Sequence, residues 1–288
     1  MSFFSPVPDI PHDTPNLRLV FKKEGKKTVL AESFSRMPFC AFPPFYSDDG
    51  GCAYTYVVNP TPGYLAGDRV EIDILLQPHA HAFITAPSAT KILKTGPNRA
   101  EQTTHIHIAD GAILEYIPSY VIPFAGSRFR QRTTIHMEEG STCLSLDWFS
   151  TGRISRGENL AFEEYDSSTM VIYGGKPIVF DRFLLRPQDE DYSALGRMES
   201  YTVSALLCLV HGGPGLSKSF LEGMRDLFQD KAAVGGLSAL SASALTARIL
   251  GANIPSVQKP LFQLIGFIRK NLPAIEDNSF LHRVVRLL

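Results

Sequence analysis

Apolar and polar residues alternate over several segments in the first two thirds of the chain. Residues 69–74 read Arg-Val-Glu-Ile-Asp-Ile, so apolar side chains would fill one face and charged side chains the other. A period of two residues is typical of a half-buried β-strand. Turn-forming residues lie on both sides, from Pro60 to Gly67 and at Pro78. The region from about Leu17 to Leu185 is therefore predicted to consist of strands and turns.

Similar strand–turn–strand units recur along this region with a period of roughly thirty residues. Each unit starts with two apolar residues two positions apart and leads into a turn that contains glycine or proline. Such a repeat predicts stacked units in an irregular solenoid, although a β-sandwich would also space its strands regularly. The apolar pairs are Ile72 and Ile74, Ile106 and Ile108, Ile135 and Met137, and Val171 and Tyr173.

The pattern changes after about Leu195. A continuous apolar run from Tyr201 to Val210 predicts a buried strand, and Ser217 would cap a helix with apolar residues at helical spacing. A strand of small residues is expected over about 236–250, and a second amphipathic helix over about 257–271. The prediction is a mainly β protein: a flexible arm at 1–15, an elongated solenoid-like β body at 16–190, and a smaller α/β part with two helices at 191–288, packed on the body.

Composition excludes some classes of function. With 44% hydrophobic and 20% charged residues, the 288-residue chain resembles ordinary globular proteins. Its net charge of −1 argues against a nucleic-acid partner, and its longest apolar run is too short to span a membrane. The cysteines Cys40, Cys52, Cys143 and Cys208 are widely spaced, which favours reduced thiols in a cytosol over a zinc site. We therefore expect a cytoplasmic protein.

Several motifs are distributed in order over nearly the whole chain. They are Pro44 to Tyr46 and Cys52, Asn59-Pro60 to Asp68, Ala86 to Lys91, Gly111 to Pro118, Asp147 with Gly152-Arg153 and Gly157-Glu158, and Phe180 to Phe183. Together they resemble the UreD (UreH) family of urease accessory proteins, with departures at Tyr64, Thr90 and Asp181 from the residues usual in the family. The resemblance implies an elongated, largely β fold, which favours the solenoid over the sandwich.

The resemblance also implies a function, that of a non-catalytic urease maturation factor. Such a scaffold bridges the urease structural subunits and the UreF partner, with the GTPase UreG bound through UreF, and guides nickel to the urease active site. Asp68, Thr90, Asp147 and Asp181 match positions linked in the family to a water-filled nickel passage. From the residues alone these carboxylates could equally be exposed or ion-paired, because an unpaired carboxylate in dry protein is costly. No tightly bound cofactor is expected, only transient Ni²⁺ held weakly by oxygen ligands.

Two histidine pairs are further candidates for metal ligands. His79 and His81 are two residues apart, so on a strand they would share one face and could hold a metal ion. His81 also lies where the family often has histidine, and the alternative is a solvated strand face. His105 and His107 repeat this spacing, and there the solvated face is favoured. Arg153 and Glu158 lie across a short turn, where a structural ion pair is the simpler interpretation.

Residues 212–219 nearly match a phosphate-binding loop between a strand and a helix. Ser217 replaces the glycine before the lysine, and Pro214 removes one of the amides that would contact a nucleotide. A capped turn is therefore favoured. A nucleotide-dependent enzyme that uses this degenerate loop is one alternative function. A β-type module that binds carbohydrate or peptide is the other.

Overall fold

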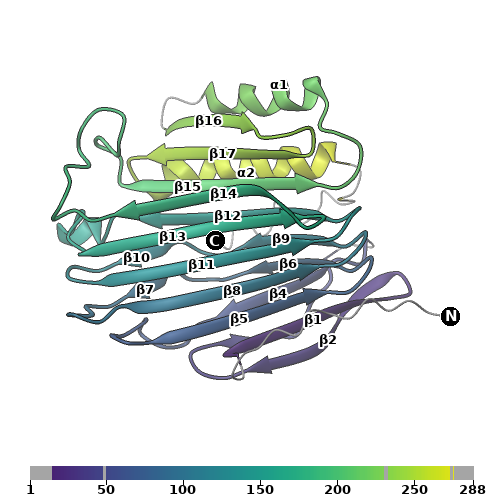
Figure 1. Cartoon of the computed structure of the whole chain (residues 1–288), viewed down its shortest axis with the longest axis horizontal. Helices are drawn as coiled ribbons and strands as arrows, with labels where there is room; N and C mark the ends of the chain where they lie inside the picture. The colour runs from purple at the N-terminus through teal and green to yellow at the C-terminus, as the bar shows by residue number, and fades with distance from the viewer. Residues whose placement is uncertain (1–14, 48–49, 230–232, 273–274, 276–288) are drawn as a thin grey trace.

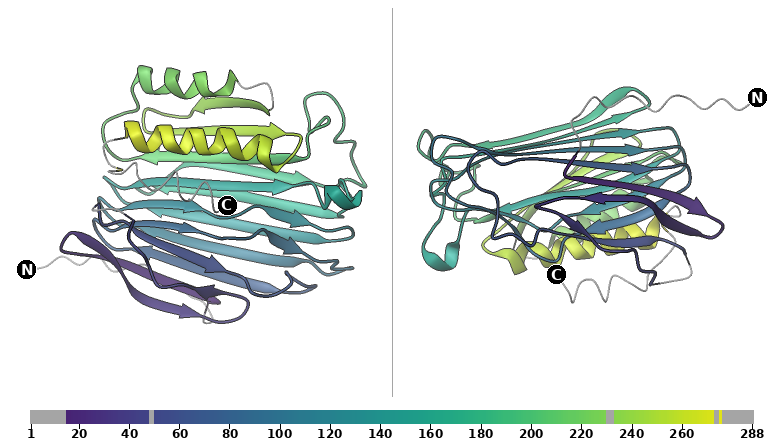
Figure 2. Two further views of the ribbon diagram at one scale, coloured as in Figure 1. Left: turned by 180° about the vertical axis from the view of Figure 1, so that it is seen from behind. Right: turned by 90° about the horizontal axis from the view of Figure 1, so that it is seen from below.

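The structure, a computed structural model, describes residues 15–47, 50–229, 233–272 and 275 (Figure 1). Two β-sheets lie face to face and form two layers when the molecule is seen from below (Figure 2). The first sheet has seven strands in the order β14-β13-β11-β8-β5-β1-β2. Their bounds are Leu17–Glu24 (β1), Lys27–Ser35 (β2), Arg69–Leu76 (β5), Ala100–Ile108 (β8), Arg128–Met137 (β11), Glu164–Tyr173 (β13) and Lys176–Leu185 (β14).

The second sheet has ten strands, and its main path runs β16-β17-β15-β12-β9-β6-β4-β3. The short strands β7 and β10 pair with each other, and β10 also pairs with β12. The bounds are Cys40–Ala41 (β3), Ala53–Val58 (β4), His81–Thr85 (β6), Thr90–Ile92 (β7), Ile113–Ile117 (β9), Val121–Pro123 (β10), Thr142–Ser150 (β12), Val203–His211 (β15), Ala233–Ala239 (β16) and Ala244–Gly251 (β17).

The chain winds between the two sheets and forms a β-solenoid of about four turns. In the first sheet β5, β8, β11 and β13 are parallel neighbours, and in the second sheet β4, β6, β9 and β12 are. The predicted mainly β, stacked fold is thus confirmed. Ile106, Ile135 and Val171 occupy the same register, as the repeat predicts. The first unit is offset, because Ile74 rather than Ile72 pairs with Ile106; a shift of two residues keeps the same face inward.

The C-terminal strands continue the second sheet beyond β12 in antiparallel order (Figure 1). The prediction of a single strand over about 236–250 is wrong, because two strands, β16 and β17, form a hairpin there. The turn between them is closed by hydrogen bonds from the amide of Leu240 to the carbonyl of Ala244 and from the amide of Ser243 to the hydroxyl of Ser241. Serine hydroxyls favour such local bonds over a continuous strand. Residues 1–14 of the expected arm lie outside the described residues.

The helix α2 (Ile254–Asn271) covers the outer face of the second sheet, and α1 (Lys218–Asp226) lies beside the edge strand β16 (Figure 2). The helix α1 begins at the predicted cap, where the Ser217 hydroxyl accepts a bond from the amide of Phe220. The helix α2 starts three residues earlier than expected because Asn253 and Ser256 form a capping box. Its apolar stripe packs on β15 and β17. Short 3-10 helices occupy Ile154–Arg156 and Leu227–Gln229. Within the described ranges, neither helix has the length and apolar character needed to cross a membrane.

A buried ion pair fixes the end of α2 to the second sheet. Arg269 donates through Nε and Nη2 to the two carboxylate oxygens of Glu115, each at 2.6 Å, and its guanidinium lies over the rings of Tyr54 and Phe83. Burial alone would raise the pKa of Glu115, but the Arg269 charge and hydrogen bonds from His81 and Arg269 outweigh it and lower the pKa to about 2. The carboxylate is therefore ionised throughout the physiological range.

Removal of one partner of this pair should be strongly destabilising. Arg269→Ala leaves the Glu115 carboxylate buried without its guanidinium, so the free energy of unfolding should fall by about 3–5 kcal/mol. The double variant Glu115→Leu/Arg269→Met should recover most of that loss, because no buried charge remains. Urea denaturation of the three proteins measures both effects.

The pH dependence gives the matching control. The pKa of Glu115 is lowered from 4.5 to about 2 on folding, so its ionised form stabilises the fold above about pH 4.5 and this contribution disappears as the pH falls toward 2. The double variant should lack this part of the acid sensitivity. Equal acid sensitivity in both proteins would contradict the assignment.

Candidate functional site

The interior between the two sheets contains a polar layer. On β8, β11 and β13 the aligned residues Gln102, Gln131 and Ser167 form one row across the first sheet. Two residues further along, a second row runs in the same register and, because side chains alternate, lies on the same face. The members of this second row are Thr104, Thr133 and Thr169. Apolar rows lie on either side of the polar layer, with Phe129 in one and Ile135 in the other.

Two adjacent cavities lie between the sheets, one within this polar layer and one beside it, where the lining is mainly apolar. The first is lined by residues that include Gln131, Thr133, Ser145 and Asp147. Its volume, counted as the space open to the centres of water molecules, is about 50 Å³. The second provides about 60 Å³. One water needs about 10–15 Å³ on this measure, so each cavity can hold several. The two cavities share part of their lining, namely Thr90, Gln102, Tyr116 and Pro118.

Asp147 is the buried carboxylate of the first cavity. Gln131 Nε2 donates to its Oδ1 at 2.8 Å, and the Ser167 hydroxyl donates to its Oδ2 at 2.5 Å. Burial raises the pKa of Asp147, the hydrogen bonds from Ser167 and Gln131 act in the opposite direction, and the nearby Asp181 adds to the rise. Each carboxylate oxygen thus has a neutral donor, and the charge is only partly compensated.

Asp181 lies on β14, the edge strand of the first sheet. Its Oδ1 is 2.5 Å from Nη2 of Arg248, so the ion pair joins β14 of the first sheet to β17 of the second. Arg248 on β17 pairs with Leu206 on β15, and Leu206 pairs in turn with Asp147 on β12. A cation and an anion that compensate each other therefore lie at the edge of the polar layer.

Asp68 lies apart from these residues, in a loop. Its Oδ2 accepts a bond from the amide of Leu65 at 2.7 Å, and it lines a hollow of about 420 Å³ at the surface. Gly63 and Leu65 line this hollow, while Tyr64 between them lines the second cavity. The structure thus brings Thr90 and Asp147 into one cavity, places Asp181 beside it and leaves Asp68 in an adjoining hollow.

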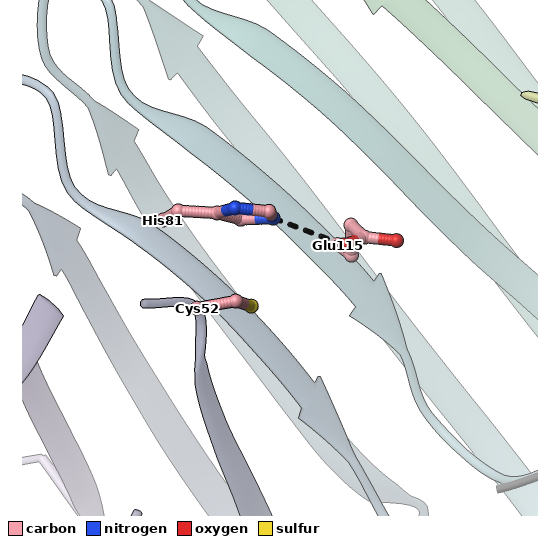
Figure 3. Close-up of side chains that lie close together, drawn as sticks. All are labelled: Cys52, His81 and Glu115. Carbon is pink, nitrogen blue, oxygen red and sulfur yellow. Dashed lines mark hydrogen bonds and ion pairs between the residues drawn. The ribbon is translucent and has the colours of Figure 1, made fainter. Parts of the chain in front are cut away.

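The two histidines expected on one strand face do not share it. His79 lies in a turn with a positive φ of 60°, whereas His81 begins β6 and contacts Glu115, with 3.1 Å between Nε2 and Oε1 (Figure 3). The predicted turn ion pair is present, because Arg153 donates through Nε to Glu158 at 2.7 Å.

The loop 212–219 has the geometry of a capped turn. Ser217 caps α1, and the exposed Lys218 side chain points to Glu222, with 3.7 Å between Nζ and Oε1. A side chain at Gly212 would collide with the backbone of Gly140 and Ser141, so the start of the loop is packed against that turn.

Sequence reasoning missed most of the polar layer, namely Gln102, Gln131, Ser167 and the three threonines. A signal was present in the repeat. In β8, β11 and β13 these residues lie at the alternate, inward-facing positions that otherwise carry apolar side chains such as Ile106 and Ile135. A polar residue at the same inward position of successive units predicts a polar layer once the register is known.

The fold and its interior define a β-solenoid with a polar layer and adjoining cavities between its sheets. The family model described as UreD urease accessory protein matches residues 13–279, so the chain belongs to the UreD family of urease accessory proteins. Proteins named urease accessory protein UreD are similar over most of their length. That of Lachnoclostridium phytofermentans is 29% identical over 248 residues, covering 85% of this chain and 90% of the relative. That of Bacillus cereus is 27% identical over 266 residues, covering 92% and 96%.

Asp147→Asn should leave the fold intact. The amide keeps an acceptor for Gln131 and a hydrogen-bonding group for Ser167, so at neutral pH the unfolding free energy should stay within about 1 kcal/mol of the wild type. Because burial raises the pKa of Asp147, wild-type stability should fall as the pH rises from the unfolded-state value through the folded-state pKa. The variant should lack this decline. Denaturation across pH measures it, and Asp147→Leu, which removes both acceptors, is the destabilised control.

Proposed function

We propose that this protein is a non-catalytic scaffold of urease maturation, which conducts Ni²⁺ through the polar interior between its sheets to the urease active site. In the cytoplasm it would bridge the urease structural subunits on one side and UreF on the other, with UreG bound through UreF. The continuous polar layer with its two adjoining cavities is the observation that carries the proposal. Membership of the UreD family supplies the link to urease.

The proposed path starts at the surface hollow beside Asp68. It passes Tyr64 into the second cavity, crosses the residues that both cavities share, including Thr90, and reaches Asp147. It leaves at the edge where Asp181 and Arg248 pair. On this proposal Asp68, Thr90, Asp147 and Asp181 are successive contacts of a hydrated cation.

The chemistry of the lining suits transit. Hydroxyl, amide and carboxylate oxygens bind a borderline divalent cation less tightly than thiolate or imidazole groups do. A conducting site must bind strongly enough to admit the ion and weakly enough to release it. A single carboxylate among neutral oxygens, as at Asp147, meets both conditions. The compensated pair at the edge keeps a second full negative charge from trapping the ion.

The passage can be tested by a change of polarity at constant volume. Thr133→Val replaces a cavity hydroxyl by a methyl group, so a hydrated cation should meet a desolvation barrier and urease activation should fall several-fold. Thr134→Val on the opposite face of the same strand is the matched control and should activate normally. Urease activity and nickel content per recovered complex are measured, and equal activation by both variants would remove the cavity from the mechanism.

The carboxylate itself is tested by Asp147→Asn. Loss of its charge should lower urease activation and nickel content together by about tenfold, the factor that corresponds to about 1.4 kcal/mol of lost attraction. Complex formation with urease and UreF should be unchanged, because the side chain is internal. Loss of the complex would assign Asp147 to structure, and full activation would exclude it from the passage.

A further inference from the structure

A second group of potential metal ligands lies on the other side of the second sheet. Cys52, His81 and Glu115 point toward one another on the outer face of this sheet (Figure 3). Their ligand atoms, a thiol sulfur, an imidazole nitrogen and a carboxylate oxygen, all lie within 4.8 Å of one another. Cys52 immediately precedes β4, His81 begins β6, and Glu115 is in the middle of β9. The three residues thus come from neighbouring parallel strands.

We propose that Cys52, His81 and Glu115 bind a borderline divalent cation, Ni²⁺ or Zn²⁺, at a site separate from the oxygen-lined interior. Thiolate, imidazole and carboxylate are the ligands that such ions take in proteins. Three protein ligands leave a position for water or for an exchanging ligand. This site does not depend on the proposed passage, because it lies on the opposite face of the sheet.

The strands hold the ligands in place before any ion binds. Ala53 pairs with Ala82 in the parallel ladder between β4 and β6, which sets Cys52 beside His81. Cys52 is 2% exposed and the Glu115 side chain is fully buried, whereas the His81 side chain is 12% exposed. An ion would therefore enter past the imidazole of His81.

Arg269 completes the surroundings of the site rather than blocking it. An ionised carboxylate has about four acceptor directions on its two oxygens, and Arg269 uses one on each oxygen of Glu115. Carboxylates that bind metals are commonly hydrogen-bonded by a further residue that orients them. Arg269 is itself held by a 3.4 Å bond to the Tyr54 hydroxyl. The guanidinium therefore keeps Glu115 ionised and oriented.

Binding has a defined proton balance. The ion replaces the contact between His81 Nε2 and Glu115 Oε1, so the remaining imidazole proton moves to Nδ1. The Cys52 thiol loses its proton to solvent, and the two positive charges of the ion are offset by the thiolate and the carboxylate. Affinity should consequently rise with pH. Since the ion joins three strands beneath the end of α2, binding should also raise the thermal unfolding temperature.

The test is titration of the full-length protein with NiCl₂ alone and with ZnCl₂ alone, followed by calorimetry and by near-ultraviolet absorption. The wild type should show a site with a thiolate-to-nickel charge-transfer band and a raised unfolding temperature. Cys52→Ser and His81→Ala should each weaken binding at least about tenfold, which is about 1.4 kcal/mol, and Cys52→Ser should abolish the band. If Cys52→Ser fails to fold, Cys52→Ala serves in its place.

Two matched controls separate this site from its alternatives. Cys40→Ser changes an exposed cysteine, and Asp147→Asn changes the interior carboxylate; both should retain the band and the affinity. Absence of binding, Ni²⁺ binding without a thiolate band, or binding lost in Asp147→Asn but kept in Cys52→Ser would each overturn the proposal. None of these results depends on urease activation, so failure here leaves the passage to be judged by its own variants.

Discussion

The in-register stacking of parallel strands is the constraint on which the rest of this molecule depends. Ile106, Ile135 and Val171 align across the first sheet, and the remaining residues of these strands are then aligned as well. A polar residue at one inward position of the repeat then becomes a continuous row. Gln102 and Gln131, with the threonines next to them, form a polar layer because of the register, although each would be an isolated defect in a single strand.

Such a layer is stable only when its groups are hydrogen-bonded or hydrated. Asp147 illustrates this, since both of its oxygens accept bonds from neutral donors, while the cavity offers room for water. The buried carboxylate of Glu115 is instead stabilised by two hydrogen bonds from the guanidinium of Arg269. Burial raises the pKa of Asp147, whereas Arg269 lowers that of Glu115. Asp147 is thus hydrogen-bonded by neutral donors beside a cavity, and Glu115 is ion-paired with the guanidinium that holds α2 on the sheet.

Local patterns predicted much of this fold. The period of two gave the strands, the helical spacing gave both helices, and the cap at Ser217 was correct because its bond is formed within one turn of chain. The contacts that define the site join distant parts of the sequence: Asp181 meets Arg248 across 67 positions, and Glu115 meets Arg269 across 154. Strand alternation reports which residues share a face, but not which strand lies opposite. For that reason the family resemblance pointed to Asp147, whereas strand alternation alone did not identify its donor Gln131.

Strand alternation also explains how one sheet can offer two kinds of metal chemistry. On β9, Tyr116 lines the interior cavities, whereas its neighbour Glu115 faces outward beneath α2. The interior face of the second sheet presents hydroxyl and carboxylate oxygens, and its outer face presents sulfur and nitrogen beside a carboxylate; the second set binds a borderline divalent cation more tightly than the first. The backbone of the sheet separates the two faces. On the two proposals made above, transit and retention would therefore use different faces of one sheet, because neighbouring residues of a strand point in opposite directions.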